Sequence, residues 1–122
     1  MSAEILNSDT ISTLLELEKD SPGLLTELLG LYRSQAPVLV VQIRVACEAK
    51  DTEGTRKGAH SLKGSSANLG AISVVEIALS MELEPACADF ELRIARLENE
   101  IASATEAFAA LAATSGGRAS AA

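Results

Sequence analysis

The sequence predicts an all-α protein, and this prediction is based on the amino-acid composition. Leucine, alanine and glutamate, which favour helices, dominate the chain, and the alternating β-branched runs typical of strands are few. Hydrophobic residues make up 48% of the 122 residues but aromatic residues only 2%, so we expect a core of Leu, Ile, Val and Ala. A chain of this length fits one domain with a substantial core.

Helix start and stop signals divide the N-terminal half. Residues 1–7 are interpreted as a short tail or packing arm, and Asp9 is expected to cap a first short helix. Ser21 followed by Pro22 predicts a new helix start, because proline is tolerated at the first helical position. Pro37 is then expected to break or bend the chain and to open another helix.

Similar signals divide the C-terminal half. Asp51 or Thr52 is expected to cap a helix that ends at Gly70 in a left-handed C-cap conformation. A further helix over 71–84 ends before Pro85, because the residue before a proline disfavours helix.

The last helix begins near Asp89 and carries apolar residues in alternating steps of four and three, a heptad seam. This seam could support a coiled-coil dimer, but packing within a monomer is the preferred interpretation. Residues 114–122 are expected to form a flexible tail, which leaves 8–113 as the domain. The seam residues are Phe90, Ile94, Leu97, Ile101, Ala104, Phe108 and Leu111.

Charge and hydropathy limit the possible partners. The net charge of −7 argues against general nucleic-acid binding, and no apolar run approaches the ~20 residues that cross a bilayer. With no signal peptide recognisable, we expect a soluble cytoplasmic protein.

Cys47 and Cys87 lack metal-type spacing and are interpreted as buried free thiols.

His60, the only histidine of the chain, is the candidate reactive residue, because a neutral imidazole nitrogen is a nucleophile near neutral pH. Helical spacing places Gly58, Leu62, Ser65 and Leu69 on the opposite face, which is expected to pack into the core. His60 is therefore expected to point outward, and the residues that share its face are Arg56, Lys57, Lys63, Gly64 and Ala67.

The surroundings of His60 favour a phosphoryl carrier that an acidic partner approaches. No Asp or Glu occurs between Gly54 and Val75, whereas three cations do. Gly64 costs about 1 kcal/mol in a helix interior and is expected to clear space beside the imidazole. Lys63 is placed to offset phosphoryl charge. A merely solvent-exposed histidine is the alternative.

The chain lacks the sequence motifs of hydrolases, of nucleotide-binding proteins and of metal sites. The chain has no G-x-S-x-G elbow, no P-loop and no kinase-type glycine-rich loop. No metal-ligand cluster accompanies His60, and no acid is recognised that would orient its ring.

The run Ala59-His60-Ser61-Leu62-Lys63-Gly64-Ser65-Ser66, closed by Gly70-Ala71, resembles the pattern A-H-x-L-K-G-S-S-x-x-x-G-A of histidine phosphotransfer (HPt) domains. Met81-Glu82 occurs where that family usually has Leu-Glu. The resemblance covers about 9–111. It implies an up-down antiparallel four-helix bundle with a short additional N-terminal helix.

By the same resemblance His60 accepts the phosphoryl group on its outer ring nitrogen, with Lys63 neutralising charge and Gly64 giving access. Receiver domains and a hybrid sensor histidine kinase are the implied partners, and the receiver, not this chain, holds Mg²⁺. Arg56, Lys57 and Ala67 are assigned to partner docking. We expect a monomeric phosphocarrier without cofactor or enzymatic activity of its own.

Two alternatives to a receiver-to-receiver phosphocarrier stay open. The His-Ser-Leu-Lys-Gly form also resembles the phosphorylated domain of chemotaxis-type histidine kinases, although 122 residues leave no room for the other kinase domains. A module that docks on a receiver without accepting phosphate is the third hypothesis.

Overall fold

The computed structural model describes residues 4–86 and 88–121, with side chains as far as Ser115 in the last helix. Within these ranges the chain is helical, and the only strand-like pairing is an isolated bridge between Leu6 and Ala71. The predicted all-α class is therefore confirmed. The five helices are α1 (Ser8–Asp20), α2 (Leu24–Glu48), α3 (Thr52–Leu69), α4 (Ile72–Leu83) and α5 (Phe90–Ala121).

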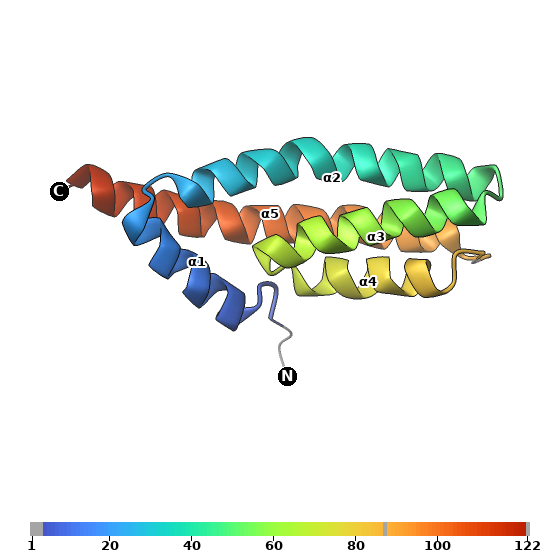
Figure 1. Cartoon of the computed structure of the whole chain (residues 1–122), viewed down its shortest axis with the longest axis horizontal. Helices are drawn as coiled ribbons and strands as arrows, with labels where there is room; N and C mark the ends of the chain where they lie inside the picture. Colours follow the sequence, from blue (N-terminus) through green and yellow to red (C-terminus); the bar gives the residue numbers. More distant parts are fainter. Residues whose placement is uncertain (1–3, 87, 122) are drawn as a thin grey trace.

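The helices α2 to α5 lie side by side, and the chain reverses direction at each connection between them (Figure 1). Within this group α3 packs between α2 and α4, while α5 packs against α2 and α4 on the other side. The short α1 lies obliquely at one end, in contact with α2 and α3. This arrangement buries one face of α3 and leaves its opposite face open.

The N-terminal segment packs against the connection between α3 and α4. The amide of Asn7 donates to the carbonyl of Gly70 at 2.7 Å, and the amide of Ile72 donates to the carbonyl of Ile5 at 3.3 Å. Asn7, not Asp9, caps α1, since its Oδ1 accepts from the amide of Thr10 at 3.0 Å. The expected Asp9 cap is wrong because Asn7, fixed by Gly70, is the last extended residue before the helix.

The start of α2 differs from the expected one. Ser21 ends α1 as its C-cap, and α2 begins after Gly23, whose φ of 96° lies in the left-handed region. The Glu18 carboxylate accepts from the amides of Gly23 and Leu25, both at 2.9 Å, and these bonds lower the pKa of Glu18. A carboxylate of the preceding helix thus replaces the Ser21 cap.

Pro37 does not end a helix, so the expected break is wrong. It lies inside α2, which runs unbroken for 25 residues. Proline removes one backbone hydrogen bond, but Ala36 and Val40 on either side of it are both buried and hold the helix against the core. Packing of α2 against the core therefore outweighs the tendency of Pro37 to end a helix.

The predicted ends of α3 are confirmed. Asp51 Oδ1 accepts from the amide of Gly54 at 2.9 Å, and Gly70 adopts a φ of 77° at the C-cap. The expected stop before Pro85 also agrees with the end of α4 at Leu83.

The heptad seam of α5 packs against the other helices of the same chain, which is the interpretation that the sequence analysis preferred to a coiled-coil dimer. Six of its seven residues belong to the hydrophobic core or pack against it, and Leu111 is partly buried. Residues from Thr114 onward, expected to be flexible, continue α5 as far as Ala121. Helix propagation from a packed nucleus through an alanine-rich stretch accounts for this difference.

Two other expectations concern cysteines and membranes. Cys47 is a free, partly buried thiol, with its Sγ 3.5 Å from Thr55 Oγ1. Cys87 lies outside the described residues. In the part of the chain that is described, no helix has both the length and the apolar character needed to span a membrane.

Candidate functional site

His60 lies in the middle of α3 and points away from the core, as expected. Its side chain is 67% exposed, whereas Gly58, Leu62 and Leu69 are buried on the opposite face. Ser65, expected on the same face, is only partly buried, and its hydroxyl donates to Gln35 Oε1 of α2 at 3.4 Å.

Ser66 takes the buried position instead. Its hydroxyl shares a 2.8 Å hydrogen bond with the hydroxyl of Tyr32. A serine next to a buried tyrosine hydroxyl satisfies a polar group that would be costly to bury alone. This bond fixes the register between α2 and α3.

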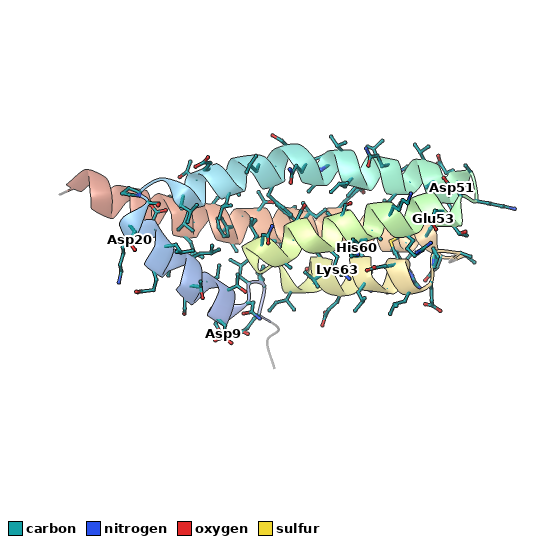
Figure 2. The ribbon with its side chains drawn as sticks, in the orientation of Figure 1. Asp9, Asp20, Asp51, Glu53, His60 and Lys63 are labelled. Carbon is teal, nitrogen blue, oxygen red and sulfur yellow. The ribbon has the colours of Figure 1, made fainter. Side chains whose placement is uncertain are left out.

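Glu82 of α4 joins His60 and Lys63 into one cluster. His60 Nδ1 lies 2.8 Å from Glu82 Oε2, and Lys63 Nζ lies 2.6 Å from Glu82 Oε1. The Glu82 side chain is only 19% exposed, so this carboxylate is held against the protein surface. Figure 2 shows His60 and Lys63 on the side of α3 that adjoins α4.

The hydrogen bond from Lys63, followed by that from His60, holds the pKa of Glu82 below its usual value. A lowered folded-state pKa means that the carboxylate contributes its stabilisation fully at neutral pH and loses it only as the pH falls through that lowered value. Glu82 is therefore an ionised acceptor over the range in which proteins normally work.

An ionised carboxylate can only accept hydrogen bonds, so Nδ1 of His60 must carry the proton. In a neutral imidazole this leaves Nε2 unprotonated, with its lone pair free. Because the imidazole is largely exposed, Nε2 is the nucleophilic nitrogen available to a partner. Carboxylates that fix a histidine tautomer in this way are a common supporting element of histidine sites.

Glu82 is the residue of this cluster that the sequence analysis did not assign, and the expectation that no acid contacts the ring of His60 is wrong. The carboxylate is 22 residues away along the chain. His60 lies ten residues before Gly70 and Glu82 eleven residues after Ala71, so a tight turn there brings both to the same level. That near-symmetric spacing is the signal that could have identified Glu82.

Most of the basic residues around His60 are already paired with carboxylates of the same chain and are therefore less available to a partner. Arg56 is paired with Glu53, one helical turn earlier, and Lys63 is paired with Glu82. Lys57 is exposed, and among the described residues it has no ion pair. Ala67 is also exposed. Lys57 is therefore the cation most available to a partner.

Gly58 and Gly64, the two glycines in the middle of α3, lie in different environments. A Cβ at Gly58 would lie 2.8 Å from Ile43 Cγ1, so Gly58 permits the close approach of α2 and α3. A Cβ at Gly64 would meet nothing within 4 Å. Gly64 therefore leaves open space on the exposed face, one turn after His60.

Alanine substitutions at these glycines are expected to have opposite effects on stability. Gly64→Ala should raise the free energy of unfolding by about 0.5–1 kcal/mol, because alanine is the better helix former. Gly58→Ala gains the same propensity but overpacks Ile43, which costs about 1–3 kcal/mol, so a net loss is expected. Urea unfolding of both variants checks this, and a stabilised Gly58→Ala would contradict the close packing.

The fold and the site together define an all-helical protein that presents one exposed histidine held by a carboxylate. The family model of the Hpt domain matches residues 27–113, which include His60, Lys63 and Glu82. The chain therefore belongs to the Hpt domain family, whose members act in phosphorelays with receiver domains and histidine kinases. Comparisons with curated proteins and with solved structures give no match.

Proposed function

We propose that this protein is a phosphorelay intermediate that accepts a phosphoryl group on His60 Nε2 from a receiver-domain aspartate and passes it to another. The observation that carries the proposal is the 2.8 Å contact between His60 Nδ1 and Glu82, which leaves Nε2 as the free nucleophile. Family membership and the exposure of the imidazole support the same role.

In the proposed reaction Nε2 attacks phosphorus of the aspartyl phosphate in line. The P–N bond forms as the P–O bond breaks, and the aspartate leaves as a carboxylate. The ring keeps its proton on Nδ1 and becomes cationic, so Glu82 faces a charge that it stabilises. Lys63, one turn after His60, is positioned to offset the phosphoryl charge.

The fold proposed for this function is an up-down antiparallel four-helix bundle of α2 to α5, with α1 as the additional helix. The alternating directions of these helices support it. The carrier is proposed to be a monomer, because the heptad seam of α5 packs against the protein's own core. Positioning and charge neutralisation are the main requirements of phosphoryl transfer, and a receiver that binds Mg²⁺ supplies the rest.

Phosphotransfer profiling tests this function. The full chain is incubated with each phosphorylated receiver domain of its source organism, and the label is located by mass spectrometry and by ³¹P NMR. We expect acid-labile phosphate on His60 Nε2 that a second receiver removes. Labelling only by a chemotaxis-type kinase with ATP supports the kinase-substrate alternative, and stable receiver binding without label supports the docking module.

A further inference from the structure

Arg93 of α5 lies against the last turn of α4, and its side chain is only 19% exposed. Its Nη1 donates to Ser80 Oγ of α4 at 3.1 Å, and its Nη2 donates to Glu84 Oε1, in the residue after α4, at 3.3 Å. Its Nε lies 2.9 Å from Asp89 Oδ1, in the residue before α5. The Glu84 contact is the longest and the most exposed of the three. The planar guanidinium, which holds several donors in a fixed arrangement, therefore links α5 to the end of α4 and to both ends of the connection between them.

Glu82, which contacts His60, belongs to the turn of α4 that Arg93 holds. Ser80 precedes Glu82 by two residues, and Glu84 follows it by two. At about 100° per residue, Ser80 and Glu82 point roughly 160° apart around the helix axis. The last turn of α4 is thus bonded to α5 on one side through Ser80 and to α3 on the opposite side through Glu82.

The contact of Glu82 with His60 depends on how α4 is rotated about its axis. Side-chain tips lie about 5–6 Å from a helix axis, so a rotation of about 20° moves a carboxylate by roughly 2 Å. A shift of that size weakens the 2.8 Å contact between Glu82 Oε2 and His60 Nδ1 steeply, through both its length and its angle. The long, flexible side chain of Lys63 can follow Glu82, whereas the shorter side chain of His60 cannot. The tautomer of His60 is therefore the property most sensitive to this rotation.

Apolar packing alone leaves the rotation of α4 less well defined. Met81 is fully buried and anchors the last turn in the core, but Leu83, the final residue of α4, is 71% exposed. Apolar contacts are non-directional, whereas charge-assisted hydrogen bonds fix the orientation of both partners. Within the described residues, the side-chain hydrogen bonds that reach from α5 to α4 come from Arg93. Arg93 thus supplies the directional contact on the α5 side of the turn.

We infer that Arg93 is a positioning residue for His60. By holding the last turn of α4, it keeps Glu82 on Nδ1 and so keeps Nε2 as the free nitrogen. This inference rests on the proposed function for its effect on phosphoryl transfer, whereas the position of the His60 proton is measurable without any phosphate. Arginine suits this role better than lysine, because its planar fork reaches Ser80 and Asp89 together.

The test replaces Arg93 and measures both the tautomer and the transfer rate in the full chain. In ¹⁵N NMR at alkaline pH, where the imidazole is neutral, Arg93→Ala should move part of the His60 proton from Nδ1 to Nε2. Single-turnover transfer from the receiver that transfers fastest in the profiling experiment should slow by about 3–10-fold. Ser80→Ala removes the acceptor on α4 and should shift the tautomer in the same direction, which keeps the inference testable if Arg93→Ala does not fold.

Two control variants separate positioning from charge and from stability. Arg96→Ala removes the same charge from an exposed residue of α5 that lines the same groove between α4 and α5. Ile94→Val removes one buried methyl group at the residue after Arg93 and lowers stability without touching the guanidinium contacts. Both controls should leave the tautomer unchanged and alter the transfer rate by less than about twofold.

A double variant decides whether Arg93 acts through Glu82. In a Glu82→Gln background, Arg93→Ala should cause less than about a twofold further loss of rate, because both substitutions remove the same contact. An unchanged tautomer in Arg93→Ala and Ser80→Ala, an equal shift in a control variant, or additive losses in the double variant would each overturn the inference. Failure of phosphoramidate, a small donor that needs no partner, to label wild-type His60 would instead overturn the proposed function, and the tautomer measurement would still decide the role of Arg93.

Discussion

Replacing His60 with glutamine is expected to abolish phosphoryl acceptance, with a loss of at least about 1,000-fold for both receiver and small-molecule donors. Glutamine keeps a polar side chain that can bond to Glu82 but has no nitrogen lone pair able to attack phosphorus. The measurement is the rate of label incorporation from a phosphorylated receiver and from phosphoramidate.

Stability provides the control for this variant. His60 is 67% exposed on the surface of α3, so the free energy of unfolding should stay within about 0.5 kcal/mol of wild type. A folded His60→Gln protein that still accepts phosphate at the wild-type rate would place the acceptor on another residue. The proposed function would then be wrong.

Replacing Glu82 with glutamine is expected to slow transfer through His60 by about 10–100-fold without removing the acceptor. The amide carries no charge to stabilise the cationic phosphorylated ring, and its NH₂ group can donate to Nδ1, which favours the wrong tautomer. Glu82 acts here as a positioning residue, through its contact with Nδ1. Single-turnover transfer rates measure the effect.

The tautomer of His60 distinguishes positioning from a general structural role. ¹⁵N NMR of the imidazole should show the proton on Nδ1 in the wild type and a shift toward Nε2 in Glu82→Gln. Glu84→Gln is the matched control, because Glu84 is close in sequence but contacts Arg93 and not His60. An unchanged tautomer, or an equal loss of rate in Glu84→Gln, would argue against the assigned role.

Local signals predicted those parts of the fold that depend on neighbouring residues. Asp51 and Gly70 cap α3 as expected, since each acts through its own backbone or through amides three residues away. The outward direction of His60 follows from helical periodicity alone. For these features, short-range physics and the final structure agree.

The features that the sequence did not predict depend on contacts between elements. Pro37 is retained inside α2 because buried neighbours hold the helix, and the Ser21 cap is replaced by Glu18. Glu82 reaches His60 only because the turn at 70–71 folds α4 back along α3. Local propensity contains none of this information, since it describes one segment at a time.

The hydrogen bond between Asn7 and Gly70 ties the N-terminal segment to the turn between α3 and α4. The family match starts at residue 27, after α1 and the segment before it. Yet Leu14 of α1 belongs to the hydrophobic core, and residues 5–7 bond to the turn that sets α4 against α3. The segment that the family model matches is thus shorter than the part of the chain that shares the hydrophobic core. The turn that places Glu82 of α4 beside His60 of α3 is therefore bonded to residues that lie outside the family match.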